Sequence, residues 1–320
     1  MSKTNENHET DRQKLIDELT EQLETSITEF MDSEKYKAFL QKMAQFHSYS
    51  LNNQLLIAIQ KPDATVCASY AGWRAQNRQV KKGEKGIKII CPAPYKVSYL
   101  KDKIDPATGQ PELLADGTPK KEKAEKTITY FKIGHTFDVS QTEGEPLPEI
   151  MHPLDGSLDE QQQKILDSIL NISPVPVTFE PIPGSANGFY SLTEKRIVVD
   201  TSLSEQHKLK TLIHEISHAM LHDTSIPDAP KDASTREVQA ESIAYVVSSF
   251  FGLDTSDYSF GYIAGWSSDK KVTELKSSLE TIRNTSNDII TKAERALSQT
   301  SAVTRKETEP VLDTVKRRCL

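Results

Sequence analysis

The chain has 320 residues, 27% of them charged, and a formal net charge of −7 at pH 7. No run approaches the roughly 18 apolar residues of a membrane span, and the polar N-terminus does not resemble a secretory signal, so we expect a cytoplasmic protein. Three cysteines without CxxC spacing argue against a disulfide framework and against a cysteine-ligated metal. The length favours two domains with separate cores.

The N-terminal part is expected to begin with helices and continue with strands. Residues 12–31 have apolar side chains every three to four positions, Ser33 is a good N-cap for a second helix, and a third must end before Pro62. β-branched and aromatic residues then predict strands at 86–100 and 126–140. The charged, turn-rich insert between them, 101–126, is expected to be a mobile hairpin or loop.

Three prolines and no periodicity in residues 141–157 mark a domain boundary. The second unit is predicted as a helix at 159–171, strands at 175–180 and 188–200, and helices around 211–223, 234–252 and 272–298. We therefore expect an α+β protein, with an α+β domain at 10–145 and a mostly helical domain with a small β-sheet at 155–298. Residues 1–9 and 299–320 are expected to be disordered tails.

The segment TLIHEISHAMLHD, residues 211–223, contains an HExxH motif. On a helix, His214 and His218 project from one face one turn apart, as two imidazoles that share one zinc ion must. Glu215 lies beside them, where it can take a proton from the attacking water and return it to a leaving amine. The motif predicts one Zn²⁺ per chain and amide hydrolysis. A solvated amphipathic helix is the alternative, which the apolar flanks disfavour.

A catalytic zinc needs a third protein ligand. Glu237 and Glu241 lie one turn apart on one face of a predicted helix, and we expect Glu237 to be the ligand while Glu241 orients a histidine, although these roles could be exchanged. A capping box with Ser234 is the structural alternative for Glu237. His222 has the wrong spacing for a third histidine ligand and is expected to be an ordinary residue of the last helical turn.

The segments HEISHAMLH (214–222) and EVQAESIAY (237–245) resemble the gluzincins, and specifically the ImmA/IrrE-type zincin domains. The resemblance implies a zinc-dependent metallopeptidase and maps the third ligand onto Glu237. Many members have Asn after the Ala of the corresponding ExxAN pattern, where this chain has Glu241.

Two further features would complete such a site. The strand at 194–202 would suit an edge strand that pairs with an extended peptide substrate. A tyrosine could stabilise the oxyanion, and the candidates are Tyr245, Tyr258 and Tyr262.

Positive charge gathers in the N-terminal part. From Lys35 to Leu100, eleven Lys and Arg stand against two acids, a balance of +9, which predicts a polyanionic partner. The densest stretch places aromatic Tyr70, Trp73 and Tyr95 among basic Arg74, Arg78, Lys81, Lys82, Lys85, Lys88 and Lys96. Cations that follow phosphates, with rings on which bases stack, are typical of single-stranded nucleic acid binding.

Structural roles are the alternative for the same residues. Trp73 could be a core residue, and residues 81–86 could form a solvated turn between helix and strand. Asn52 and Asn53 offer amides to phosphates or sugars, or could instead bridge the helix to the sheet.

Three segments, SYSLNNQLLIAIQKPDAT (48–65), WRAQNRQVKKGEKGIKI (73–89) and FDVSQTEGEPLP (137–148), resemble the single-stranded-DNA-binding domain of ArdC-type antirestriction proteins of conjugative plasmids and related mobile elements. That family joins this domain to a C-terminal zincin. The resemblance implies a protein that shields incoming single-stranded DNA from host endonucleases. The rival hypothesis is an ImmA-like regulatory protease that cleaves a repressor, and a weaker one is a scaffold that binds a partner through the 270–298 helix.

Overall fold

The computed structural model describes residues 18–147, 158–227 and 229–302. Its architecture is α+β, as the sequence predicted. After helical residues 18–29, the N-terminal elements are α2 (Ser33–Gln45), α3 (Leu51–Gln60), β1 (Cys67–Ala68), α4 (Tyr70–Ala75), β2 (Arg78–Val80), β3 (Ile87–Asp102), β4 (Lys121–Asp138), the 3-10 helix η1 (Val139–Gln141) and β5 (Thr142–Gly144). The C-terminal elements are α5 (Leu158–Ile172), β6 (Val177–Glu180), β7 (Gly188–Ser191), β8 (Arg196–Asp200), α6 (Glu205–Leu221), α7 (Ala233–Phe250), α8 (Ile263–Ser267) and α9 (Val272–Ala302).

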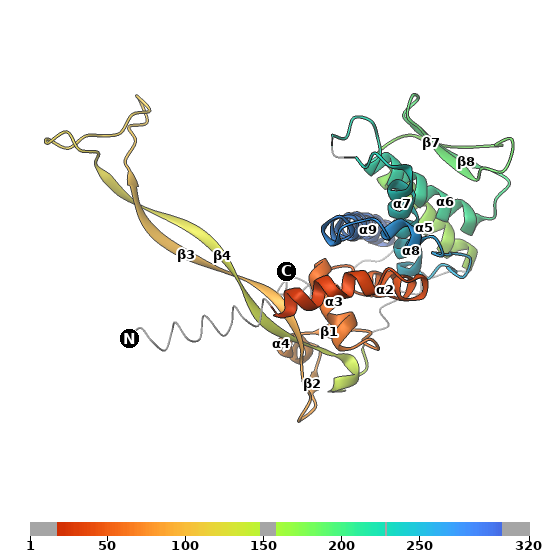
Figure 1. Ribbon diagram of the computed structural model, residues 1–320, viewed down its shortest axis with the longest axis horizontal. Helices are drawn as coiled ribbons and strands as arrows, with labels where there is room; N and C mark the ends of the chain where they lie inside the picture. The colour runs from red at the N-terminus through yellow and green to blue at the C-terminus, as the bar shows by residue number, and fades with distance from the viewer. Residues whose placement is uncertain (1–17, 148–157, 228, 303–320) are drawn as a thin grey trace.

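A long antiparallel ribbon projects from the body (Figure 1). β3 and β4 pair continuously, from Ile87 with Thr136 to Asp102 with Lys121. At roughly 3.4 Å per residue, the 16 residues of β3 give a ribbon about 50 Å long. The predicted hairpin in the insert is thus confirmed as its outer end. We call residues 91–132 the arm.

The root of the ribbon is held by α3. β3 is an edge strand of the sheet β1-β4-β3, so one row of its backbone groups has no strand partner. Asn53 accepts from the Ile90 amide at 2.8 Å and donates to the Ile90 carbonyl at 2.9 Å, and Gln60 makes the same pair with Lys88 at 2.9 Å each. Two amide side chains on α3 therefore act in place of a neighbouring strand.

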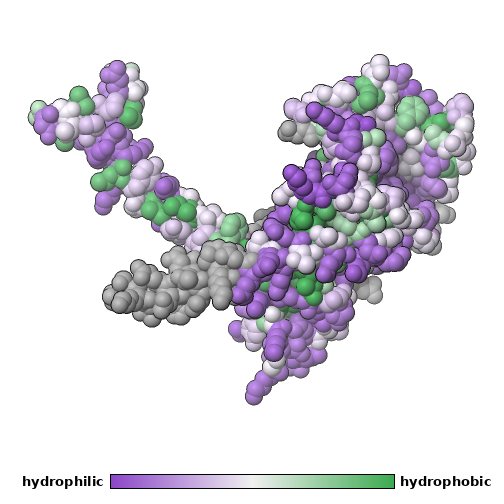
Figure 2. Space-filling view, in the orientation of Figure 1, coloured by the Kyte–Doolittle hydropathy of each residue, from purple (hydrophilic) through white to green (hydrophobic). Residues whose placement is uncertain are grey.

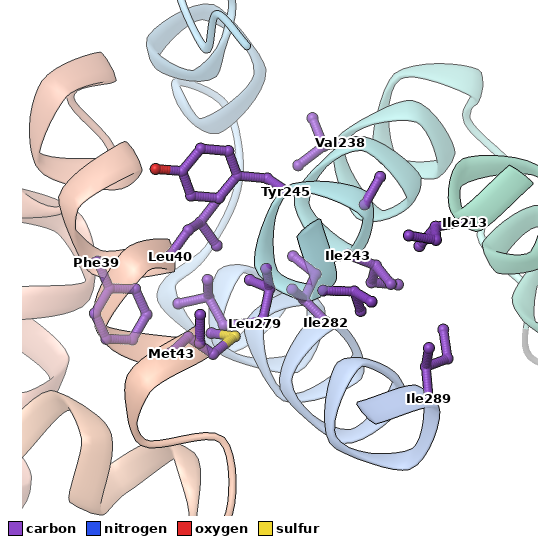
Figure 3. Close-up of a cluster of buried hydrophobic side chains, with 14 of the residues drawn as sticks. Phe39, Leu40, Met43, Ile213, Val238, Ile243, Tyr245, Leu279, Ile282 and Ile289 are labelled. Atoms are coloured by element: carbon purple, nitrogen blue, oxygen red, sulfur yellow. The ribbon is translucent and has the colours of Figure 1, made fainter. Parts of the chain in front are cut away.

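The largest hydrophobic core contains residues from both halves of the chain. Figure 3 shows Leu40 and Met43 of α2 near Tyr245 of α7 and Leu279 of α9. The hydroxyls of Tyr36 and Ser242 are 2.8 Å apart across the α2–α7 contact. The expectation of two separate cores is met only in part. A smaller core of Phe46, Ile57, Ala64, Ile87 and Ile89 lies within the N-terminal half, whereas α2 of the same half packs against α7 in the larger core. The predicted domain ranges stay a prediction, and residues 148–157 of the expected boundary lie outside the described residues, as do most of the predicted tails.

The C-terminal helix α9 is an internal element. Its apolar residues Leu275, Leu279, Ile282, Ile289 and Ile290 are buried in the same core. This face packs within the protein, so only the polar side of the 270–298 helix could contact a partner, and that role stays a prediction.

The small sheet has the order β6-β8-β7, with β6 parallel and β7 antiparallel to β8. β8 is the middle strand, so the prediction that residues 194–202 supply an edge strand for a peptide is wrong. β7 is the edge that lies beside α6. Among the described residues, no helix is both long and apolar enough to cross a membrane.

At the start of α2 and of α7, the N-cap residue is an aspartate and not the serine considered from the sequence. The Asp32 carboxylate, not Ser33, accepts backbone amides at the start of α2, and Asp232, not Ser234, does so for α7. Aspartate is an equally good N-cap, so the sequence allowed either residue. Because Asp232 caps α7, the alternative of a Ser234–Glu237 capping box does not hold.

Candidate metal centre

Three side chains from α6 and α7 converge. His214 and His218 lie one turn apart on α6, with their Nε2 atoms 3.0 Å from each other. Glu237 of α7 faces both, with carboxylate oxygens 3.5 Å from His214 Nε2 and 3.6 Å from His218 Nε2. One candidate ligand atom from each residue lies within 4.8 Å of the others. Two imidazole nitrogens and one carboxylate oxygen at this separation suit a divalent ion such as zinc.

Glu241 lies on the other side of His214. Its Oε2 is 3.2 Å from His214 Nδ1, on the nitrogen that faces away from Glu237. A proton on Nδ1, donated to Glu241, leaves the Nε2 lone pair for a metal. Burial opposes a charge on His214, but Glu237 and Glu241 outweigh it and raise the pKa of His214 to about 10. The same histidines hold the pKa of Glu237 well below its ordinary value.

His218 is held by a different and neutral pair. His222 Nδ1 lies 2.9 Å from His218 Nδ1, and His222 Nε2 lies 3.0 Å from the Gln239 side-chain oxygen. Burial lowers the pKa of His222 to about 4, so its ring is neutral at pH 7. A neutral His222 that donates to Gln239 must accept at Nδ1, which fixes the His218 proton on Nδ1 and leaves Nε2 free. His222 is therefore outside the ligand cluster, as expected, but it orients a member of it.

Glu215 occupies a buried position under the edge strand. Its carboxylate accepts the backbone amide of Tyr190 in β7, and burial raises its pKa above that of an ordinary glutamate. β7 can approach α6 because residue 188 is glycine: a Cβ there would lie 2.6 Å from the Thr211 methyl. A raised pKa makes Glu215 a better proton acceptor near neutral pH.

Asp223, just beyond α6, ties the β7–β8 hairpin to that helix. Its Oδ2 pairs with Lys195 Nζ at 2.6 Å and accepts from the Tyr190 hydroxyl, while its Oδ1 accepts from the Ser225 amide at 2.8 Å. Lys195, then Tyr190, keep the pKa of Asp223 far below its ordinary value. The sequence reasoning missed Tyr190, Asp223 and Gln239, because no spacing rule connects residues so far apart in the chain.

A cavity of about 280 Å³ opens beside the cluster. His214, Glu215 and Glu241 line it together with Tyr258, His207 and Lys210. Of the three tyrosine candidates, Tyr258 borders this cavity, Tyr245 is buried in the core against Tyr258 and Phe260, and Tyr262 is 45% exposed. Burial raises the pKa of Tyr258, so its hydroxyl keeps its proton and can donate.

Several residues predicted to contact DNA have structural roles. Trp73 is 1% exposed and its indole N–H donates to the Phe137 carbonyl at 2.8 Å, so its ring faces are not available for stacking. Both polar atoms of the Asn53 side chain bond to β3, as described above. Arg78 donates to the Thr142 hydroxyl at 2.9 Å and to the Glu145 carbonyl, which secures β5 beside β2.

The remaining predicted contacts are more accessible. Tyr70 is 53% exposed, with its ring edge-on to Phe137. Asn52 and Lys88 are half-buried. The exposed cations are Arg74, Lys81, Lys82 and Lys85, the lysines lying in the turn between β2 and β3. The structure brings these lysines together on one turn, and their role in DNA binding stays a prediction.

Two family models match the chain. Residues 9–137 match the N-terminal domain of the anti-restriction factor ArdC, and residues 171–248 match the IrrE N-terminal-like domain of peptidase family M78. The chain is thus similar to an ArdC N-terminal domain in its first half and to an IrrE-like domain in its second half. The second match includes His214, His218, Glu237 and Glu241, and the first includes the whole arm.

Individual relatives were also found. The chain is 28% identical over 313 residues to the uncharacterized protein pXO2-81 of Bacillus anthracis, an alignment that covers 88% of this chain but 52% of that protein. The chain thus spans about half the length of this curated relative. Two crystal structures of the antirestriction protein ArdC from plasmid R388 are similar: the metal-free form (TM-score 0.42, 21% identity, 81% of this chain and 87% of that one) and the Mn(II)-bound form (0.41, 20%, 80% and 86%).

Proposed function

We propose that the protein is an antirestriction factor that binds single-stranded DNA through its ArdC-type domain and carries a zinc-dependent peptidase site in its IrrE-like domain. The observation that carries the enzymatic part is the convergence of His214, His218 and Glu237 within 4.8 Å. The ArdC family match supports the DNA part, together with the basic balance of residues 35–100.

The donor set favours zinc among divalent ions. Two imidazole nitrogens and one carboxylate oxygen are a common zinc ligand set in hydrolases, and they leave a coordination position for a reactant. When bound, the ion would act as a Lewis acid that polarises a substrate carbonyl and favours ionisation of the attacking water. Glu241 and His222 would keep the two histidines in the tautomers that bind it.

The remaining chemistry belongs to residues of the chain. Glu215 would accept the proton of the attacking water and pass it to the leaving amine, and the Tyr190 amide holds its carboxylate in place. Tyr258 lines the same cavity and would supply a hydroxyl that donates to the developing oxyanion. The edge of β7 lies where an extended peptide could be held beside α6.

Glu215→Gln separates the two parts of the proposal. The variant keeps the three ligands and removes the proton acceptor, so we expect zinc content and oligonucleotide affinity to be retained while peptide hydrolysis is lost. Protection of a DNA substrate from a restriction endonuclease is then compared between the variant and wild type. Protection that survives assigns antirestriction to DNA binding. Protection that disappears while DNA binding persists assigns it to proteolysis, and a regulatory protease becomes the better description.

The DNA part has its own test. Filter binding of wild-type protein to an oligonucleotide should show a preference for single strands over duplex, and the affinity should fall as the salt concentration rises. Equal binding to both forms, with no salt dependence, would remove the DNA part and leave the metal centre unaffected.

A further inference from the structure

One face of the arm carries a row of tyrosines and lysines. In an antiparallel ribbon, side chains alternate between two faces, and directly paired residues share a face. The pairs Ala93–Tyr130, Tyr95–Ile128, Val97–Lys126 and Tyr99–Ala124 therefore lie on the same face, followed toward the body by Cys91–Lys132. We call Tyr95, Val97, Tyr99, Lys126, Ile128, Tyr130 and Lys132 the tyrosine face.

This face is open to solvent within the described part of the chain. Tyr95 is 46% exposed, Tyr99 42% and Tyr130 37%. Figure 1 shows that the arm extends away from the body. In Figure 2, hydrophobic and hydrophilic residues alternate along the surface of the arm. Exposed aromatic rings on a projecting ribbon are unfavourable unless a partner covers them, so their presence indicates a binding surface.

The rings and cations are arranged together. Tyr95 and Tyr130 form an edge-to-face pair with ring centroids 5.5 Å apart. The Lys126 ammonium lies 5.6 Å from the centre of the Tyr99 ring. Within the described residues, neither Lys126 nor Lys132 forms an ion pair, and the one acid on this face, Glu122, is paired with Lys101 at 3.1 Å. The face therefore presents aromatic rings and unneutralised positive charge.

The opposite face differs in charge and chemistry. There Lys96 pairs with Glu125 at 3.3 Å and Lys121 with Asp102 at 2.5 Å, which leaves Lys123 as the one cation of this face without an ion pair among the described residues. Prolines occupy positions 92 and 94, and one aromatic residue, Phe131, is exposed at 55%. This difference favours the tyrosine face as the binding side of the arm.

We propose that the tyrosine face is a single-stranded DNA-binding surface, on which bases stack against Tyr95, Tyr99 and Tyr130 while Lys126 and Lys132 contact phosphates. Every base has a π-face, and stacking on aromatic side chains with nearby cations is how proteins hold unpaired strands without reading their sequence. This inference rests on the proposed DNA-binding function. It places the stacking rings on the arm, since Trp73 in the body is buried.

The test uses the full chain and a fluorescein-labelled oligothymidylate, with affinity measured by anisotropy. Tyr95→Thr, Tyr99→Thr and Tyr130→Thr remove one ring each while keeping strand propensity. We expect each to weaken binding roughly fivefold or more, and the triple variant to weaken it further. Phe131→Thr is the matched control, because it removes an exposed ring from the opposite face, and it should change the affinity by less than twofold. Zinc content confirms that the body is folded.

Cross-linking gives a readout that a loss of stability would not mimic. With 5-bromodeoxyuridine in the oligonucleotide, irradiation of the wild-type complex should link it to peptides that contain the three tyrosines. The arm proposal would be overturned if the triple variant bound the oligonucleotide with wild-type affinity, or if Phe131→Thr lost as much affinity as the tyrosine variants. Either outcome would leave the proposed function unaffected. Failure of the wild type to bind would overturn both. Unchanged DNA affinity with altered self-association would make the face a contact between copies of the chain instead.

Discussion

The metal centre and the arm are built in opposite ways. At the metal centre, His214 and His218 each have a partner behind them, and two packed helices hold all the ligands. The tyrosines of the arm stand on a ribbon that the body holds at its root, through Asn53 and Gln60, through the pairing of β1 with β4, and through burial of Ile87 and Ile89. The difference agrees with the two proposed roles, since a site for chemistry needs fixed geometry, whereas a surface for a flexible strand needs reach and exposed rings.

The largest expected effect is loss of the metal. Glu237→Ala removes one of three protein ligands, so we expect the purified variant to lose stoichiometric zinc. Glu241→Ala is its matched control, one turn away on the same helix, and should weaken affinity about 10- to 100-fold without abolishing binding. Metal analysis after dialysis, with titration calorimetry, distinguishes the two. If Glu237→Ala retained stoichiometric zinc and Glu241→Ala bound none, Glu241 would be the metal ligand and Glu237 the residue that orients a histidine.

Trp73 tests whether the body of the ArdC-type domain offers a stacking ring. Because it is buried, Trp73→Ala should lower the free energy of unfolding by about 3–5 kcal/mol. Trp73→Phe keeps most of the volume and loses one hydrogen bond, so it should cost about 1 kcal/mol and leave DNA affinity within twofold. Chemical denaturation and anisotropy measure these quantities. A folded Trp73→Phe protein with much weaker DNA binding would show that the ring contacts DNA after all.

The hydrogen bonds from Asn53 and Gln60 of α3 to β3 can be removed one residue at a time. Asn53→Ala leaves the amide and carbonyl of Ile90 without these partners at a partly buried position, which should cost about 2 kcal/mol of stability. Gln60→Ala removes the equivalent pair at a more exposed position and should cost about 1 kcal/mol or less. Hydrogen exchange of the β3 amides should accelerate more in the first variant. Equal, negligible effects would mean that β4 alone holds β3.

A further expected effect depends on pH. Burial opposes ionisation of Asp138, but hydrogen bonds from Ser140, Thr65 and Val66 outweigh it and lower its pKa. A carboxyl whose folded pKa is lowered stabilises the fold at neutral pH, and this contribution is lost as the pH falls through the folded pKa. Asp138→Asn should therefore cost about 1–2 kcal/mol at pH 7, with a difference that shrinks in acid. A difference constant from pH 7 to pH 3 would contradict this.

The sequence predicted the helices and the convergence of the metal cluster better than it predicted the DNA surface. Four-residue spacing on a helix fixes where His214 and His218 point, so a motif carries geometry. Composition does not predict which residues are buried. The same basic stretch contains Lys82, which is exposed, and Trp73, which is buried. The order β6-β8-β7 could not be predicted, because pairing of strands distant in the chain depends on tertiary packing.

The contact between α2 and α7 bears on how such a protein can evolve. Tyr36 bonds to Ser242 and packs edge-on to Phe260, with ring centroids 5.2 Å apart, so the first helices serve as a lid on the IrrE-like half. A gene fragment that encoded this half alone would yield a polypeptide whose apolar surface on α7, normally covered by α2, is exposed to solvent. Such a polypeptide should tend to aggregate. Recombination that exchanged either half would have to preserve the contact between α2 and α7, so we expect the two halves to be inherited as one unit.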